Sequence, residues 1–284
     1  MLLDKYQAIW LSHSSIKDFL NCQRSYYYKN IYKNPKTGRK IAIIKPSLSL
    51  GQVVHDVIEE LSHLPVEKRF AVPLVEQFKK KWQKISGING GFRTPDEEQE
   101  FFRRGIDMIN MLELHPGPLK KRAIKIKEKI PFYWFSMEDN MILCGKIDWL
   151  EYIEKTDSIH IIDFKTGKSD EREDSLQLPI YYLVAKNCQN RSIEKASYWY
   201  LDRETKPTKI SLPTVEEAQK TIQKVAERIK LARQLKHYKC ISDDKEGCRY
   251  CAPLLAVVSG KGKFMRVGDF GEEIYYLSDD AVSL

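Results

Sequence analysis

Two segments of the sequence decide the fold: Cys144-Gly145-Lys146-Ile147-Asp148-Trp149 and Ile161-Ile162-Asp163-Phe164-Lys165-Thr166-Gly167-Lys168. The polar residues 154–158 between them predict a short loop that joins two antiparallel strands. In that pairing Asp148 falls opposite Asp163, with the two Cβ atoms roughly 4.5–5.5 Å apart. Like charges repel at that distance, and apolar neighbours make an uncompensated charge costly. The two carboxylates therefore call for a cation.

A divalent metal ion is the simplest cation for this place, because carboxylate oxygens are hard ligands that suit magnesium or manganese. Lys165 follows Asp163 by two positions, so both side chains share one face of a strand. The lysine could position or activate the attacking water and stabilise charge on a phosphate. The hypothesis is a metal-dependent phosphodiesterase site. The alternative for Asp163 alone is an ordinary turn residue.

Two further groups could complete the metal ligands. His55 lies on a helix predicted for residues 50–64, and packing of that helix on the sheet could bring its imidazole to the same ion. The backbone carbonyl of Phe164 points at the same strand edge and could add an oxygen ligand. Taken alone, His55 is more often a packed or surface histidine.

Gln177 and Tyr181 form a second constellation. They lie four positions apart on a helix predicted for residues 175–188, so their side chains share one face. The helix follows the Asp163 strand, and its N-terminal end favours anions. Gln177 could bond a DNA phosphate or base, and Tyr181 could do the same or stack. For each residue alone, a purely structural role is the simpler interpretation.

Four of the six cysteines form a third constellation. Cys248 and Cys251 have the two-residue spacing of a metal-ligand pair, and Cys240 lies eight positions before Cys248. With Cys22, four thiolates would suit an iron–sulfur cluster or zinc, and would tie the N-terminal helix to the C-terminal end. The alternative is free thiols without a metal.

The bulk properties restrict the class of protein. The chain has 284 residues, 42% hydrophobic residues and a formal net charge of +8, which suit a globular protein with an anionic partner, nucleic acid first. A solvated lysine-rich surface is the alternative. No apolar run reaches the roughly 18 residues of a membrane span, and the first residues lack the apolar core of a signal peptide. We therefore expect a cytoplasmic protein without membrane contact.

Periodicity along the chain predicts an α/β sandwich with a mixed sheet. Strand-like segments are expected at residues 123–135, 141–153, 159–165 and 194–202. Further helices are expected at residues 11–33, 75–85, 97–114 and 213–235. The helix at 175–188 should cross over and bring the last strand beside the third. The residues after 251 show no clear pattern.

Five motifs, in this order, resemble those of the PD-(D/E)XK nuclease superfamily and of its RecB-like branch. That branch includes the nuclease domains of RecB and AddB and the CRISPR-associated adaptation exonucleases. The resemblance covers about residues 11–251. The motifs are Leu11-Ser12-His13-Ser14-Ser15-Ile16-Lys17-Asp18-Phe19-Leu20-Asn21-Cys22, Gly51-Gln52-Val53-Val54-His55, Gly145-Lys146-Ile147-Asp148, Asp163-Phe164-Lys165-Thr166-Gly167 and Gln177-Leu178-Pro179-Ile180-Tyr181.

The resemblance implies a fold and a site. The fold is a restriction-endonuclease-like core with a mixed central sheet flanked by helices, plus a helical insertion. The implied cofactor is Mg²⁺ or Mn²⁺, with Lys165 catalytic and Gln177 and Tyr181 supporting. The implied ligands are His55, Asp148 and Asp163. Relatives with a [4Fe-4S] cluster usually have their last cysteine after the two-residue-spaced pair, whereas here Cys240 precedes it.

We expect residues 1–284 to form a single nuclease domain. Its parts are the N-terminal helix at 11–33, the helical insertion at 65–122, the catalytic core at 123–202 and the C-terminal helix and cysteine segment at 213–251. The basic clusters of the insertion suggest a surface that faces DNA, with a solvated surface as the alternative.

The expected function is that of a DNA nuclease, an exonuclease acting on single strands or duplex ends in repair, recombination or phage-type DNA processing. The alternative is a non-catalytic DNA-binding subunit of a larger helicase-nuclease or CRISPR-type complex, with a helicase or another protein as partner. The intact set of Asp148, Asp163 and Lys165 speaks against that alternative. RNA is a third candidate substrate.

Overall fold

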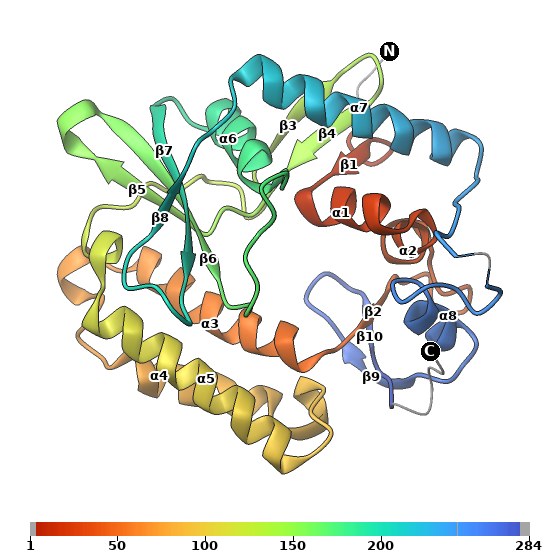
Figure 1. Ribbon diagram of the computed structural model, residues 1–284, viewed down its shortest axis with the longest axis horizontal. Coiled ribbons are helices and arrows are strands. Elements are labelled where there is room, and N and C mark those ends of the chain that lie inside the picture. The colour runs from red at the N-terminus through yellow and green to blue at the C-terminus, as the bar shows by residue number, and fades with distance from the viewer. Residues whose placement is uncertain (1–3, 243, 279–284) are drawn as a thin grey trace. The chain divides into compact units, whose positions relative to one another are not determined.

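A computed structural model describes residues 4–242 and 244–278 of the chain (Figure 1). Within these residues the chain forms two compact units. The first unit comprises the residues up to 13 together with 50–84 and 99–224, and the second comprises 14–49, 85–98 and the residues from 225 onward.

The central sheet of the first unit has four strands in the order β5-β6-β7-β8. They are β5 (Trp149–Ile153), β6 (Ser158–Lys165), β7 (Ser192–Tyr200) and β8 (Thr208–Ile210). β6 is antiparallel to β5 and parallel to β7, so the mixed sheet is confirmed. The ladder ends at the pair Trp149 and Ile162, which leaves Asp148 and Asp163 one step beyond it and opposite each other, as the sequence predicts.

A second sheet of the first unit corrects two of the expected strands. Its strands lie in the order β1-β4-β3 and are β1 (Ile9–Leu11), β4 (Met141–Cys144) and β3 (Phe132–Ser136). The strand expected at 141–153 is therefore two strands in different sheets, because the chain leaves extended pairing at 145–148. The strand expected at 123–135 begins only at Phe132, since the residues before it form one isolated bridge, from Ala123 to Glu151.

The longer helices of the chain follow their apolar periodicity closely. They are α3 (Pro46–His63), α4 (Leu74–Trp82), α5 (Pro95–Leu114), α6 (Gln177–Cys188) and α7 (Val215–Gln234), with short 3₁₀ turns at Val66–Lys68, Gln83–Ile85, Gly87–Gly90, Gly117–Lys120 and Glu154–Thr156. α7 begins with a capping box, in which the Thr214 side chain accepts the Glu217 N–H and the Glu217 carboxylate accepts the Thr214 N–H. α6 connects the parallel strands β6 and β7, as expected.

The second unit contains elements that the sequence does not reveal. Its sheet has the order β2-β10-β9, with β2 (Ile41–Ile43), β10 (Glu273–Tyr276) and β9 (Lys263–Val267). α8 (Ala252–Val258) lies in the chain between β2 and β9. The expected helix at 11–33 is three segments, α1 (His13–Asn21), α2 (Gln23–Tyr26) and a π-helical turn at Tyr27–Ile31, because the backbone of Cys22 is extended. In the described part of the chain no helix is both long and apolar enough to cross a membrane.

Candidate active site

Four of the predicted site residues meet at the open end of the β5–β6 pair in the first unit. α3 supplies His55, the bend before β5 supplies Asp148, and β6 supplies Asp163 and Lys165. Nδ1 of His55 lies 3.2 Å from Oδ1 of Asp148, and Nζ of Lys165 lies 2.9 Å from Oδ2 of Asp163. The structure thus brings together side chains that are up to 110 positions apart, in the arrangement that the strand register predicts.

The backbone of Phe164 faces the same place. Its N–H donates a 3.0 Å hydrogen bond to Oδ2 of Asp148. In a strand the N–H and the C=O of one residue point to the same side, so the Phe164 carbonyl also faces the Asp148 edge. The next carbonyl, that of Lys165, accepts from the Leu201 N–H at 3.0 Å on the opposite side. A ligand role for the Phe164 carbonyl stays a prediction, and the direction in which the carbonyl points is compatible with that role.

Two motif glycines allow this close packing. A Cβ on Gly51 would lie 3.2 Å from Oγ1 of Thr166, so glycine lets α3 approach the end of β6. A Cβ on Gly145 would lie 2.9 Å from Cε1 of Tyr181, so glycine lets that ring lie against the backbone before Asp148. Real Cβ atoms essentially never come as close as the contact at Gly145, and the contact at Gly51 is tighter than nine in ten real Cβ contacts. Glycine therefore relieves a steric clash at Gly145 and a tight contact at Gly51.

Gln177 holds the site residues in place. Its Nε2 donates to Oδ1 of Asp163 at 2.8 Å and to the Tyr181 hydroxyl at 3.3 Å, while its Oε1 accepts from Nζ of Lys165. Both Gln177 and Tyr181 are buried. The structure places both side chains within the site, in contact with its residues, and binding of substrate by either one stays a prediction.

The site contains two residues that sequence reasoning missed. Oε2 of Glu171 lies 3.2 Å from Nζ of Lys165, and the same ammonium group stands 4.7 Å from the centroid of the Tyr198 ring. Glu171 belongs to a charged loop without periodicity, so no pattern marks it. Tyr198 is paired with Asp163 in the parallel ladder, and a strand alignment of β6 with β7 could have found it.

Burial and like charge perturb the acids. Burial, and then the charge of Asp148, raise the pKa of Asp163 to about 7. Burial would also raise the pKa of Asp148, but the charge and hydrogen bond of His55 hold it below its ordinary value. Burial would lower the pKa of His55, yet the Asp148 carboxylate outweighs burial and raises it to about 9. Protonated His55 and Lys165 thus balance the carboxylates when no metal is bound.

The donor set fits a hard divalent ion. Oδ2 of Asp163 is buried and receives no hydrogen bond of good geometry from the described residues, although the Lys165 ammonium is near. Two carboxylates, an imidazole and a backbone carbonyl are ligands that suit Mg²⁺ or Mn²⁺. A bound divalent ion would neutralise the carboxylate charge, so that His55 and Asp163 would no longer have to be protonated.

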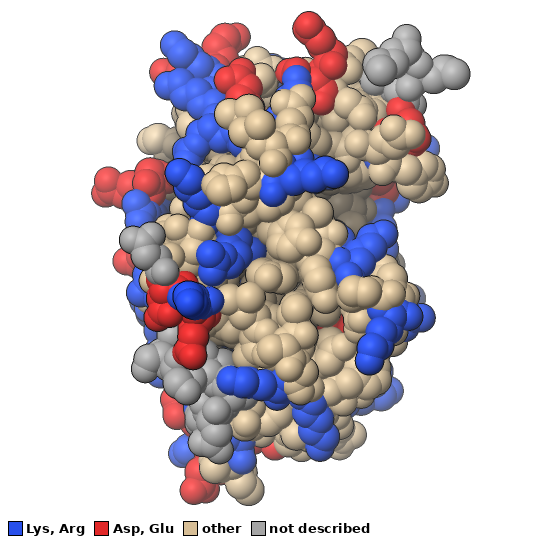
Figure 2. Space-filling view, turned by 90° about the vertical axis from the view of Figure 1, so that its right-hand side faces the viewer, with Lys and Arg blue, Asp and Glu red and all other residues tan. Residues whose placement is uncertain are grey.

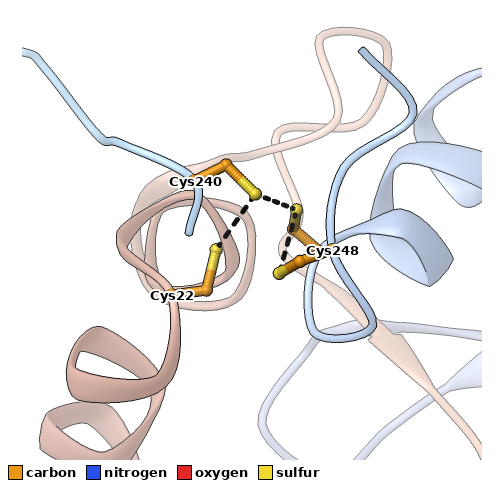
Figure 3. A group of neighbouring side chains, drawn as sticks. Cys22, Cys240 and Cys248 are labelled. Carbon is orange, nitrogen blue, oxygen red and sulfur yellow. Dashed lines mark hydrogen bonds between the residues drawn. The ribbon is translucent and has the colours of Figure 1, made fainter. Parts of the chain in front are cut away.

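The four predicted cysteines also meet, in the second unit. Their Sγ atoms all lie within 4.8 Å of one another, and successive contacts measure 3.9 Å (Cys22 to Cys240), 3.5 Å (Cys240 to Cys251) and 3.8 Å (Cys251 to Cys248). Figure 3 shows their sulfurs pointing toward one another. Gly247 makes this possible, because its φ is +88° and a Cβ there would lie 2.6 Å from Sγ of Cys251.

The distances between these sulfurs can be compared with those expected for zinc and for an iron–sulfur cluster. Four thiolates around one tetrahedral zinc ion stand about 3.8 Å apart, given a zinc–sulfur bond of about 2.3 Å. Three of the six sulfur pairs have about that spacing, and the other three lie within 4.8 Å. In a [4Fe-4S] cluster each sulfur binds a different iron, so the sulfurs must move apart to admit it. Burial would raise the pKa of Cys240, but hydrogen bonds, first that from the Ser242 N–H, lower it to about 7 and favour the thiolate that metals bind.

Comparison with known proteins gives a family. Residues 10–253 match the model of the PD-(D/E)XK nuclease superfamily. Among solved structures, a proposed exonuclease from Eubacterium rectale is similar, with a TM-score of 0.50 and 15% identity over 86% of this chain and 87% of that chain. At that identity the likeness shows the fold alone, a mixed α/β core of the restriction-endonuclease type. No curated protein matches. Since the family match spans most of the sequence, the chain belongs to the PD-(D/E)XK nuclease superfamily.

Proposed function

We propose that this protein is a metal-dependent deoxyribonuclease of the RecB-like branch. Membership of the superfamily makes it a nuclease, a hydrolase of phosphodiester bonds. The observation that supports the proposal most is the pair of half-buried Asp148 and buried Asp163 at one strand edge, with His55 on one side and Lys165 on the other. A chain that served only as a binding subunit would have no use for this costly arrangement of buried charges.

His55, Asp148, Asp163 and the Phe164 carbonyl would hold the Mg²⁺ or Mn²⁺ ion. When bound, such an ion polarises a phosphoryl oxygen and lowers the pKa of bound water. The contribution of the chain is orientation. The Phe164 N–H fixes the Asp148 carboxylate, and Gln177 fixes the Asp163 carboxylate, so neither acid has to reorganise when substrate arrives.

Lys165 acts as a fixed positive charge. Burial would lower the pKa of its ammonium group, but the carboxylates of Asp163 and Glu171 outweigh burial and raise it above the ordinary value. Lys165 therefore stays protonated at neutral pH, which suits stabilisation of negative charge on the reacting phosphate better than proton abstraction. Gln177 and Glu171 hold the ammonium group in position for that task.

The finer function is an exonuclease on single-stranded DNA or duplex ends in repair, recombination or phage-type processing. The net charge of +8 supports an anionic polymer as substrate. If the protein works within a larger complex, a helicase is the partner that this function favours.

The four cysteines are proposed to hold a metal centre, either a [4Fe-4S] cluster or zinc. The cysteines come from the start of α2 and from the segment that leads into α8, so a metal would join these two parts of the second unit. Metal analysis and the absorption spectrum after anaerobic purification separate the alternatives. A band near about 400 nm indicates iron–sulfur, whereas zinc in a colourless protein indicates the tetrahedral ion.

Cleavage of labelled DNA tests the nuclease proposal. Purified protein is given single-stranded and double-stranded DNA, and RNA in a separate arm, with Mg²⁺ or Mn²⁺ or without either. Cleavage should require the metal and be lost in Asp163→Ala and Lys165→Ala. Lys168→Ala is the matched control, because this exposed lysine pairs only loosely, at 3.5 Å, with Glu100. Binding of DNA without metal-dependent cleavage would favour the non-catalytic subunit instead.

A further inference from the structure

A cavity of about 520 Å³ in the second unit belongs to neither candidate metal site. Tyr27, Tyr28 and Tyr238 line it together with Arg24, Arg233 and Lys236. We propose that this cavity binds one nucleotide unit, with the base stacked on the tyrosines and the phosphate held by the cations. The proposal deepens the nuclease function and rests on it for the identity of the polymer.

Local backbone structure brings these side chains together. Arg24 lies on α2, and Tyr27 and Tyr28 open the π-helical turn that follows. Single π-helical turns are rare and occur often at functional sites. On the other side, α7 ends in a left-handed turn at Lys236, whose φ is +50°, and Tyr238 follows two residues later. The Arg24 N–H donates to the Lys239 carbonyl at 3.2 Å and fixes the two segments against each other.

The tyrosines form an aromatic platform. The rings of Tyr27 and Tyr238 have centroids 5.0 Å apart at an interplanar angle of 32°, and the Tyr28 ring meets that of Tyr27 at 5.2 Å and 70°. Each of the three is only partly buried, so part of the platform remains accessible. Every nucleobase has a flat π face, and stacking on aromatic side chains is how proteins bind single strands without reading sequence.

The charges at the cavity are of one sign. Among the residues that the structure describes, three of the lining side chains are cationic and none is an aspartate or glutamate. Burial lowers the pKa of Lys40, and the charges of Lys33 and of the lining residue Arg233 lower it further. Figure 2 shows a face of the molecule on which Lys and Arg side chains stand around uncharged residues, with Asp and Glu side chains mainly toward its left and upper margins. A phosphate would relieve this repulsion.

The size and chemistry of the cavity select the ligand. Its volume falls in the usual range of small-molecule sites, roughly 300–1,000 Å³. The ligand that fits both the platform and the cations is an aromatic base bearing a phosphate. That chemistry occurs in a single-stranded oligonucleotide and in a free mononucleotide, and the experiment has an arm for each.

Fluorescence anisotropy with a labelled oligothymidylate tests the platform. The buffer contains no added divalent ion, so the signal needs no cleavage. Tyr238→Leu should weaken binding roughly 5- to 100-fold, the range for loss of one base stacked on an aromatic ring. Tyr238→Phe keeps the ring and should bind within about threefold of the unaltered protein. An oligomer of the same length with abasic spacers should bind equally to Tyr238→Leu and to the unaltered protein.

The charged residues give a second measurement that does not depend on the tyrosines. Replacing Arg24, Arg233 and Lys236 by glutamine should reduce the slope of log K against log salt by about 0.7, as expected when one phosphate of a single strand is no longer neutralised. Lys261→Gln, which replaces an exposed lysine of the same unit, is the control and should leave the slope unchanged.

Competition with thymidine monophosphate identifies the source of the ligand. Displacement of the oligomer by the mononucleotide means that the cavity accepts the free nucleotide, and failure to displace it means that the cavity requires a strand. The inference is overturned if folded Tyr238→Leu binds the oligomer as tightly as the unaltered protein, or if the glutamine variant keeps the full salt slope. Cleavage assays with Mg²⁺ on the same variants report separately on the nuclease site, which contains none of these residues.

Discussion

The two candidate metal centres of this protein are built on opposite principles. The carboxylate site lies at the end of a β ladder, where register alone puts Asp148 opposite Asp163. The thiolate site is assembled by loops and short helices, where Cys22 meets Cys240 across 218 positions of sequence. The first site brings its own cations, His55 and Lys165, whereas the sulfurs of the second contact mainly one another.

The difference predicts different consequences of losing a metal. In the carboxylate site, protonation of His55 and Asp163 substitutes for the missing ion, so the fold should persist while catalysis stops. In the thiolate site a bound metal would supply the interaction that keeps the segments together. One centre should therefore control activity and the other should control stability.

The largest expected effect is on activity, from Asp163→Asn. Cleavage of DNA should fall by about a thousandfold or more, because a ligand of the ion and the partner of Lys165 are lost together. The unfolding temperature should stay the same or rise, since a buried carboxylate with a raised pKa opposes folding at neutral pH. Single-turnover cleavage and thermal unfolding measure the two quantities. A large loss of stability with retained cleavage would contradict the prediction that the carboxylate site controls activity rather than stability.

Cys251→Ser should show the opposite pattern. We expect the bound metal to be lost and the unfolding midpoint to fall by about 5–10 °C, as for removal of a ligand from a structural metal site. Metal content and calorimetry provide the test, with proteolysis between residues 240 and 251 as a local readout. Cys188→Ser serves as the control, because Cys188 lies outside the cluster and contacts the Phe132 carbonyl. Equal destabilisation by both serines would refute a stabilising metal.

Gly145→Ala should perturb the carboxylate site by a smaller amount. The new methyl group meets the Tyr181 ring, and the ring or the strand must move, at a cost of about 1–3 kcal/mol. Because Tyr181 contacts Gln177, cleavage should slow about tenfold. Gly167→Ala is a close control, since a Cβ at Gly167 meets nothing within 4 Å. Similar behaviour of the two alanine variants would argue against the steric role of Gly145.

The smallest effect concerns pH. The pKa of Asp163 rises from 3.8 to about 7 in the folded protein, and that of His55 rises from 6.5 to about 9. Both groups bind their proton more tightly when folded, so their stabilisation is complete below the unfolded pKa and is lost as pH rises through the folded value. Metal-free protein should lose a few degrees of unfolding temperature between pH 6 and pH 9, and Mg²⁺ should restore more at pH 9. A rise in stability over this range would contradict the assignment.

Sequence reasoning predicted which side chains meet at the end of β6, because short-range rules determine their placement. The alternation of a strand fixes that Asp163 and Lys165 share a face, and the length of the turn fixes the partner of Asp163. The helix α6 and its parallel strands follow from the same periodicities. Glu171 could not be found, because it reaches Lys165 from a loop whose path depends on tertiary contacts.

The second unit was harder to predict for a physical reason. Its strands have three to five residues, too few for a period to emerge, and β2 pairs with β10 across more than 200 positions. The break at Cys22 leaves no signature in the helical pattern of residues 11–33, since the apolar spacing continues through it. The spacing of the cysteines in the sequence indicated which thiols meet. The distances between their sulfur atoms depend on the turn at Gly247, which the sequence pattern does not reveal.

The contact of Cys22 with Cys240 also bears on the order of folding. The two thiols enclose 218 positions of chain, and closing so long a loop in an unfolded chain costs about 5 kcal/mol of entropy. Structure that forms first within the loop shortens the effective path, and every residue proposed for the carboxylate site lies inside it. We therefore expect metal uptake by the cysteines to be the final, slow step of refolding, with sheet formation before it by circular dichroism. A metal bound at the four cysteines would then be found only in molecules whose remaining structure has already folded.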